Sequence, residues 1–157
     1  MIDIVSKILD RAKMQHLTIA TAESCTGGMV AAALTSIPGS SAVLDRGWVT
    51  YSNHAKRDEL GVPMDLINAH GAVSEQVAVA MAEGALSHST VDIAVSITGI
   101  AGPDGGTADK PVGLVYFACA MRGHQTIHLH HIFLGNRNEI RRQAANAALT
   151  LLDKRLS

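Results

Sequence analysis

The stretch GSSAVLDRGWVTYSNHAK, residues 39–56, predicts the fold because it passes from a turn through a strand to a helix within one short segment. An apolar run follows the Gly-Ser-Ser turn, and residues 47–51 are strand-like. Ser52 or Asn53 is a suitable helix N-cap, which places Lys56 in the first turn of the following helix. A strand followed directly by a helix is the unit from which α/β folds are built.

Helices and strands alternate in the same way on both sides of this stretch. Helices are expected at residues 3–15, from Ser52 or Asn53 to residue 60, at residues 29–35, 65–70 and 75–86 and over about 18 residues after Asn136, and strands at residues 17–22, 47–51, 91–97, 112–120 and 125–134. Helices separate the early strands, which can therefore run parallel, whereas the turn at Arg122-Gly123 makes at least one late strand antiparallel. The sequence predicts an α/β fold, a three-layer α/β/α sandwich with a mixed, mostly parallel five-stranded sheet.

Composition limits the classes of protein to which the chain can belong. Its 157 residues predict one domain over residues 1–157, and 47% hydrophobic against 17% charged residues indicates a globular protein with extensive buried surface. That apolar composition hints at a homodimer. With 13 basic and 14 acidic residues, no charge excess points to nucleic acid or to anionic lipid as a partner.

The expected location is the cytoplasm. The first 15 residues alternate apolar and charged side chains and lack the pattern of a signal peptide, and no segment approaches the roughly 20 apolar residues of a membrane span. The two cysteines, Cys25 and Cys119, are far apart in sequence and form no CxxC motif, which is typical of reduced thiols. The sequence predicts a soluble, cytoplasmic protein.

The opening stretch holds a possible nucleophile and base, because Ser41, Tyr51 and Lys56 could meet in the folded chain. A serine hydroxyl needs a base, and lysine serves only if its pKa falls from about 10.4 toward neutrality. The positive end of the helix dipole favours a neutral amine in the first turn. The residues alone nevertheless favour a solvated surface lysine beside a turn serine. Cys25 is a rival nucleophile, but no histidine pairs with it, and a buried small residue is the favoured interpretation.

Two loops are candidates for holding a ligand. Residues 24–28, SCTGG, join a strand to a helix and offer backbone N–H groups to an anion, but simple capping of the helix is equally consistent with them. Residues 98–106, TGIAGPDGG, follow a buried strand. Ligands gather at the carboxyl ends of strands in open α/β sheets, which favours a pocket at this second loop.

Histidines and arginines near the C-terminus have less specific interpretations. His128 and His130 fall on one face of a strand, but no carboxylate or cysteine completes a metal-binding set, so a polar exposed face is favoured and no metal is predicted. Arg137 and Arg141 lie one helical turn apart. They could clamp a phosphate, but hydrogen bonds to neighbouring carbonyls are the favoured interpretation.

Several motifs in a fixed order resemble the CinA C-terminal-domain family. They are AESCTGG, the GSS turn, VTYSN-x-x-K, GAVS and ITGIAGPDGG…KPVG, and the resemblance runs from Leu17 to Arg142. It implies the same sandwich fold with one antiparallel strand. It also implies hydrolysis of nicotinamide mononucleotide to nicotinic acid mononucleotide and ammonia, a step of pyridine-nucleotide recycling in NAD metabolism. With nothing before its first helix, the chain resembles the stand-alone enzyme of this competence and damage-inducible family.

The resemblance also implies roles for individual residues. It makes Ser41 the catalytic serine with Tyr51 and Lys56 as its partners, and this overrides the surface interpretation of Lys56. Together with the two loops it predicts a substrate-binding set composed of Ser24, Thr26, Gly27, Gly28, Thr98, Gly99 and Gly102. Neither a metal nor a cofactor is needed, because the nucleophile comes from the protein. Two alternatives stay open: a nucleotide-binding regulatory module without chemistry, and an amidase acting on a different amide.

Overall fold

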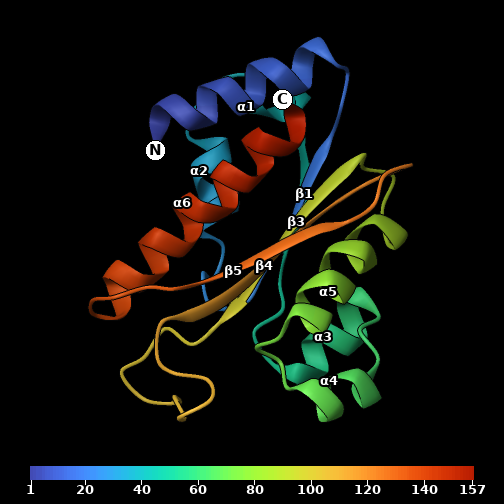
Figure 1. Cartoon of the computed structure of the whole chain (residues 1–157). Helices are drawn as coiled ribbons and strands as arrows, with labels where there is room; N and C mark the ends of the chain where they lie inside the picture. Colours follow the sequence, from blue (N-terminus) through green and yellow to red (C-terminus); the bar gives the residue numbers. More distant parts are fainter.

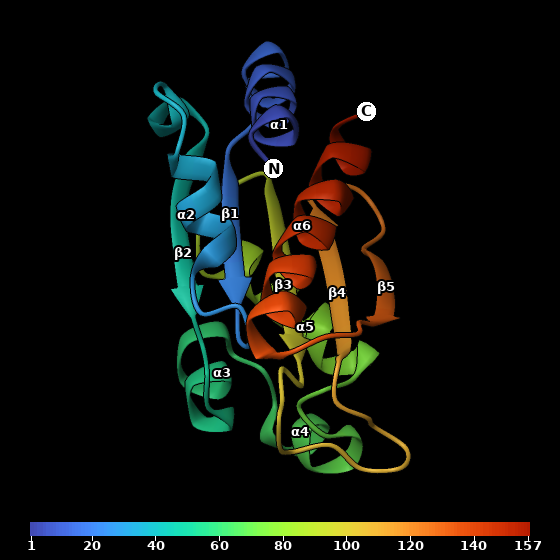
Figure 2. The ribbon, with the colours of Figure 1, turned by 90° about the vertical axis from the view of Figure 1, so that its left-hand side faces the viewer.

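In the computed structural model, which covers residues 1–157, one sheet lies between two layers of helices, as Figures 1 and 2 show. The helices are α1 (Ile2–Met14), α2 (Met29–Thr35), α3 (Asn53–Leu60), α4 (Met64–His70), α5 (Glu75–Ser87) and α6 (Arg137–Leu156), with a 3₁₀ turn, η1, at Ser40–Ala42. The strands are β1 (Ile19–Glu23), β2 (Leu44–Val49), β3 (Ile93–Gly99), β4 (Leu114–Met121) and β5 (Ile127–Ile132).

The sheet has the strand order β2-β1-β3-β4-β5. β2, β1 and β3 run parallel because helices connect them, whereas β4 runs antiparallel to both of its neighbours. Four strands therefore point in one direction and one in the other. The predicted mixed, mostly parallel five-stranded sheet is confirmed.

Each face of the sheet buries its own set of side chains. α1, α2 and α6 cover one face and α3, α4 and α5 the other (Figure 1). Successive side chains of a strand point to opposite faces, so Ile19 packs toward the first layer and Ala20 toward the second. In β3, Ile93 and Ala94 divide in the same way, and this central strand is buried from Ile93 to Thr98 because helices cover both of its faces. The predicted three-layer sandwich is confirmed.

The strand predicted at residues 47–51 is the element whose position differs most from expectation. The structure places it at Leu44–Val49, because its backbone pairs with β1, with Leu44 opposite Ile19 and Val49 opposite Glu23. The predicted helix start is confirmed, since the Ser52 hydroxyl caps α3 by accepting the Ala55 N–H at 3.0 Å.

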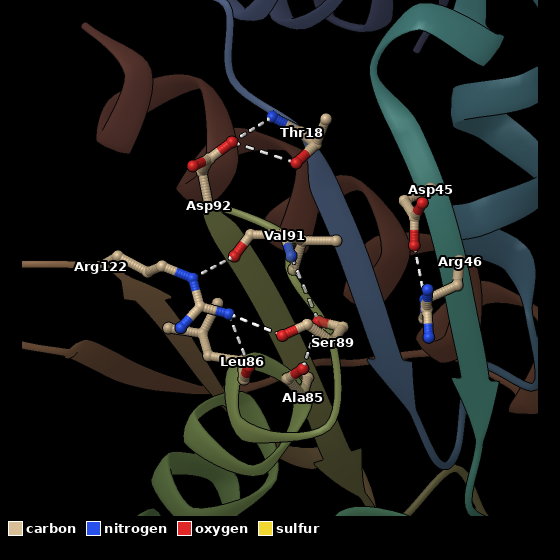
Figure 3. Close-up of polar contacts among 9 residues, drawn as sticks. All are labelled: Thr18, Asp45, Arg46, Ala85, Leu86, Ser89, Val91, Asp92 and Arg122. Atoms are coloured by element: carbon tan, nitrogen blue, oxygen red, sulfur yellow. Dashed lines mark hydrogen bonds and ion pairs between the residues drawn. The ribbon is translucent and has the colours of Figure 1, made fainter.

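Polar contacts secure the end of the sheet where β1 and β3 begin, as Figure 3 shows. The Asp92 carboxylate accepts both the N–H and the hydroxyl of Thr18, at 2.8 and 3.0 Å. The Arg122 guanidinium donates to the carbonyls of Leu86, Ser89 and Val91 and so satisfies the C-terminal end of α5 and the loop that follows. None of the helices combines the length and the apolar character that crossing a lipid bilayer requires.

Candidate active site

A pocket of about 180 Å³ lies where β1, β2 and β3 end. The residues that line it include Ser24, Tyr51, Lys56, Thr98, Gly99 and Arg137. The lining residues come from five separate segments of the chain. This is the carboxyl edge of the parallel part of the sheet, where ligands bind in open α/β folds.

Lys56 reaches Ser24 at the base of this pocket. The Lys56 Nζ lies 3.1 Å from the Ser24 Oγ and 3.0 Å from the Thr50 carbonyl oxygen. The Lys56 side chain is 1% exposed, and no carboxylate forms an ion pair with it. The two groups are therefore within the distance that proton transfer between a serine and a lysine requires.

Burial shifts the protonation equilibrium of this lysine. Desolvation disfavours the ammonium form and lowers the pKa of Lys56 from 10.5 to about 8, while the neighbouring Cys25 opposes the shift. A lysine paired with Asp or Glu would keep its proton to higher pH. The interpretation of Lys56 as a solvated surface residue was wrong.

The turn that carries Ser24 is held by the residue before it. Glu23 is fully buried, and its carboxylate accepts the Thr26 hydroxyl at 2.6 Å and the N–H groups of Val30 and Ala31 at 3.0 and 3.1 Å. These bonds join the end of β1 to the first turn of α2. Glu23 was not among the residues predicted from the sequence. Its role could have been predicted because an acidic residue directly before a small-residue turn that opens a helix can cap the exposed N–H groups of that helix.

Arg141 holds the same turn from the other side. Its Nε donates to the Cys25 carbonyl at 3.0 Å and its Nη2 to the Thr26 carbonyl at 3.2 Å. Gly27 passes close to this guanidinium with φ +61°, and a Cβ there would lie 3.2 Å from the Arg141 Nη2. The interpretation of Arg141 as a donor to neighbouring carbonyls is confirmed.

Tyr51 and Arg137 meet at the mouth of the pocket. The Arg137 Nη2 donates to the Tyr51 hydroxyl at 3.0 Å, and its Nη1 donates to the Gly102 carbonyl at 2.7 Å. Tyr51 is 59% exposed and turns only its carbonyl toward Lys56, 3.5 Å from the Nζ. Its hydroxyl therefore faces an arginine instead of the lysine.

Ser41 does not join this site, contrary to the predicted meeting of Ser41, Tyr51 and Lys56. It lies in η1, before β2, whereas Lys56 follows β2. β2 has six residues, and at about 3.3 Å per residue it separates the two positions by roughly 20 Å. Gly39, in the turn before η1, approaches Lys13 near the end of α1, at the opposite edge of the sheet.

The predicted substrate-binding residues fall into two groups. Ser24, Thr98 and Gly99 line the pocket, and the Thr98 hydroxyl donates to the Ala72 carbonyl at 2.8 Å. The remaining four, which do not line the pocket, are Thr26, Gly27, Gly28 and Gly102. Thr26 is fully buried and its hydroxyl already donates to Glu23, so the hydroxyl has no proton left to donate to a ligand.

Cys25 lines the pocket but is unsuited to be the nucleophile. It is 5% exposed and free, and burial raises the pKa of its thiol from 9.0 to about 11. The thiolate, which is the reactive form, is scarce near neutral pH. The prediction that Cys25 is a buried small residue is confirmed.

Other features of the molecule lack the chemistry of the Ser24 pocket. A larger hollow of about 380 Å³ between β5 and α6 is lined mainly by Leu129, Phe133 and uncharged polar residues. His128 pairs with Glu75 at 3.2 Å, and His130 lies against the Tyr116 ring at a centroid distance of 5.1 Å. These two histidines are exposed, as predicted for a polar strand face.

Comparison with known proteins gives consistent matches over nearly the whole chain. The family model described as the CinA C-terminal domain matches residues 2–156. The chain is 53% identical to the nicotinamide-nucleotide amidohydrolase PncC of Escherichia coli (strain K12) over 89% of this chain and 85% of that protein. It is 52% identical to a CinA-like protein of Syntrophobacter fumaroxidans over 91% of this chain, and it covers 34% of that protein. The chain thus spans about a third of the length of this relative and of several other curated relatives.

Solved structures agree with these sequence matches. The competence/damage inducible protein CihA of Agrobacterium tumefaciens has a TM-score of 0.95 and 47% identity, with 99% of this chain and 94% of that chain covered. A CinA superfamily protein of Escherichia coli has a TM-score of 0.93 and 35% identity, with 98% and 90% covered. The chain therefore belongs to the CinA C-terminal domain family.

Proposed function

We propose that this chain is a nicotinamide-nucleotide amidohydrolase that uses Ser24 as its nucleophile and Lys56 as its base. One observation carries the proposal: a fully buried lysine, free of any carboxylate partner, lies 3.1 Å from a serine hydroxyl at the edge of a pocket. The 53% identity to a protein named nicotinamide-nucleotide amidohydrolase supplies the substrate class. The nucleophile is thus Ser24 and not Ser41.

The reaction follows from the positions of these two groups. Neutral Lys56 takes the Ser24 proton while the Oγ attacks the carboxamide carbon of nicotinamide mononucleotide. The tetrahedral intermediate collapses, the C–N bond breaks, and the protonated lysine gives its proton to the departing ammonia. Lys56 then takes a proton from water, which attacks the acyl-Ser24 ester. Nicotinic acid mononucleotide leaves and the serine regains its proton.

The dimensions of the pocket suit the reacting part of the substrate. Pockets that enclose a whole drug-sized ligand measure about 300–1,000 Å³. The pocket beside Ser24, at about 180 Å³, is smaller. It accommodates the nicotinamide ring and its carboxamide, and the ribose phosphate lies toward the open mouth formed by Tyr51 and Arg137.

Two serine variants test the assignment. Ser24→Ala should lower ammonia release from nicotinamide mononucleotide by at least about 10³-fold, because losing a nucleophile that acts together with its base removes most of the catalysis. Ser41→Ala is the matched control and should keep wild-type turnover, since Ser41 lies beyond the far end of β2. Loss of activity in Ser41→Ala with retention in Ser24→Ala would overturn the assignment.

Substrate comparison separates this proposal from its alternatives. The purified chain is incubated with nicotinamide mononucleotide, free nicotinamide and an unrelated amide such as a glutamine peptide, and ammonia is measured. Release from the nucleotide alone supports the proposal. Release from none of them favours a nucleotide-binding module, and release from all three favours a broader amidase.

We also propose that the chain forms a homodimer. β2 and β5 are the outer strands of the sheet and leave backbone groups unpaired, and Val49 and Ile132 on them are exposed. Light scattering during gel filtration should give twice the 16.5 kDa mass of the chain. A mass of one chain at micromolar concentration would contradict this.

A further inference from the structure

Arg141 connects α6 to the turn after Ser24, although more than a hundred residues separate them. Its Nε and Nη2 donate to the consecutive carbonyls of Cys25 and Thr26, at 3.0 and 3.2 Å. The planar guanidinium presents its donors in a fixed fork, so two bonds from one side chain determine the orientation of both peptide groups. The contact is part-buried, which limits competition from water.

The orientation of a carbonyl fixes the N–H group of the same peptide. In a trans peptide the C=O and N–H bonds point in opposite directions. Because the Cys25 carbonyl points to Arg141, the Thr26 N–H points away from Arg141. The Ser24 carbonyl accepts the Gly27 N–H at 3.0 Å, so the Cys25 N–H points away from the centre of the turn.

Of these two N–H groups, that of Cys25 is free to donate to a ligand, because Cys25 lines the pocket whereas Thr26 is fully buried and does not line it. Neither the Cys25 N–H nor the Thr26 N–H donates to another residue, whereas the neighbouring N–H groups of Ser24 and Gly27 are both bonded within the chain. In other serine hydrolases the N–H of the residue after the nucleophile forms part of the oxyanion hole. Cys25 is that residue here, and it lines the pocket.

The turn is also held from within. The Thr26 hydroxyl is bonded to Glu23, so Thr26 is fixed by its side chain on one side and by its carbonyl on the other. Gly27 must be glycine both for its φ of +61° and because the Arg141 Nη2 occupies the space beside it. Only Arg141, however, bonds the carbonyl of Cys25, the residue of this turn that follows Ser24 and lines the pocket.

We propose that Arg141 is a positioning residue that holds Cys25 through its carbonyl, so that the Cys25 N–H stays in place as an oxyanion donor beside Ser24. The inference rests on the proposed function, because the oxyanion in question forms when Ser24 attacks the carboxamide. Arg141 itself does not touch the substrate. It acts through the backbone, and donors fixed in advance stabilise a developing charge without reorganising during the reaction.

The test compares Arg141→Ala with Arg142→Ala. Arg142 is the next residue of the same helix and is exposed, and its guanidinium makes no hydrogen bond, so it controls for the loss of a positive charge from α6. Arg141→Ala should lower kcat by about 10²-fold, the effect of impairing an oxyanion donor, with KM nearly unchanged. Arg141→Lys should fall between the two, because one ammonium cannot hold both carbonyls in the same geometry.

A sulfur substrate separates positioning from a general loss of structure. The thioamide analogue of nicotinamide mononucleotide develops its charge on sulfur, which accepts hydrogen bonds more weakly than oxygen. The ratio of oxygen to sulfur turnover should therefore fall toward one in Arg141→Ala and stay at the wild-type value in Arg142→Ala. A merely destabilised enzyme would lose both activities equally and keep the ratio, and that result would overturn the inference.

The outcomes distinguish the inference from the proposed function. If the wild-type chain releases no ammonia from nicotinamide mononucleotide, the proposed function fails before Arg141 is tested. If the wild type is active, Ser24→Ala is inactive and Arg141→Ala keeps both kcat and the oxygen-to-sulfur ratio, the proposed function stands and the role of Arg141 is refuted.

Discussion

Lys56 and Ser24 are 32 residues apart in the sequence, yet the Lys56 Nζ lies 3.1 Å from the Ser24 Oγ. Two parallel neighbouring strands produce this relationship. β1 ends at Glu23 opposite Val49 of β2, so the residues that follow both strands emerge at the same edge of the sheet. Ser24 follows β1 directly, and Lys56 lies in the first turn of the helix after β2.

Replacing Lys56 with arginine should abolish most of the activity while preserving the positive charge. A guanidinium is not deprotonated in proteins, so it cannot accept the Ser24 proton. The expected loss in kcat is about 10²–10⁴-fold, the usual contribution of a general base. Ammonia release from nicotinamide mononucleotide measures it, and an active Lys56→Arg enzyme would show that another group takes the proton.

The rate should rise with pH up to the pKa of Lys56 and then level off. Burial lowers the pKa of Lys56 to about 8, and only the neutral amine acts as a base. Below this value kcat/KM should fall about tenfold for each pH unit, because the fraction of Lys56 in the neutral form falls in that proportion. The pH profile of kcat/KM checks this, and a profile that stays flat from pH 6 to 9 would contradict a lysine base.

The same lysine should make stability depend on pH. Its pKa is about 8 in the folded chain against 10.5 for the model amine, so between these values the unfolded chain binds more protons. Stability should therefore rise with pH from about 8 to 10.5, by at most about 1.4 kcal/mol per pH unit, and this slope should vanish below about 8.

Lys56→Met isolates this contribution, since methionine has a similar length and no charge. The difference in unfolding free energy between wild type and Lys56→Met should narrow as pH rises from 8 to 10, with the variant the more stable at pH 7. Urea unfolding at several pH values measures both chains. A difference that does not change with pH would mean that the folded and unfolded chains bind the Lys56 proton equally well.

Removing the Tyr51 hydroxyl should have a smaller effect than removing either Ser24 or Lys56. The hydroxyl is bonded to Arg137 at the mouth of the pocket, and only the Tyr51 carbonyl faces Lys56. Tyr51→Phe should therefore lower kcat by no more than about tenfold, with a larger effect on KM. Tyr116→Phe, on β4, is the control. A loss as large as that of Lys56→Arg would instead assign a proton-transfer role to the hydroxyl.

Gly27→Ala should destabilise the chain more than Gly123→Ala. Both glycines have positive φ, +61° and +77°, so both alanine variants cost about 1–2 kcal/mol in backbone strain. A Cβ at Gly123 meets nothing within 4 Å, whereas one at Gly27 lies 3.2 Å from the Arg141 Nη2. Thermal unfolding compares the two variants, and equal shifts in Tm would show that Arg141 moves aside at no cost.

The order of the elements could be predicted from the sequence because local patterns specify it. The strand predicted at residues 91–97 overlaps β3, which begins and ends two residues later, and Ser52, Ser74 and Asn136 cap α3, α5 and α6 with their side chains, as their residue types predict. The least accurate boundaries were those of β2, an edge strand whose mostly exposed residues give little apolar periodicity.

The separation of Ser41 from Lys56 could have been predicted from the sequence. A strand places the residues before it and after it at opposite edges of the sheet, so Ser41 and Lys56 were on different sides of the expected strand at residues 47–51 as well. Ser24, assigned to substrate binding, follows a parallel strand and shares the edge with Lys56. The sheet topology therefore indicates which serine lies near Lys56, whereas the short sequence distance between Ser41 and Lys56 does not.

The sequence by itself determined the alternation of helix and strand, the caps, and hence the layered α/β fold, because these depend on neighbouring residues and on periodicity. Only the tertiary structure decided which serine meets Lys56 and that Lys56 is buried with a pKa of about 8. Desolvation depends on all the segments that surround a side chain. The segments that line the pocket with Lys56 include the turn after β1, the end of β3 and the loop before α5. The residue pattern at positions 39–56 carries no information about these distant segments.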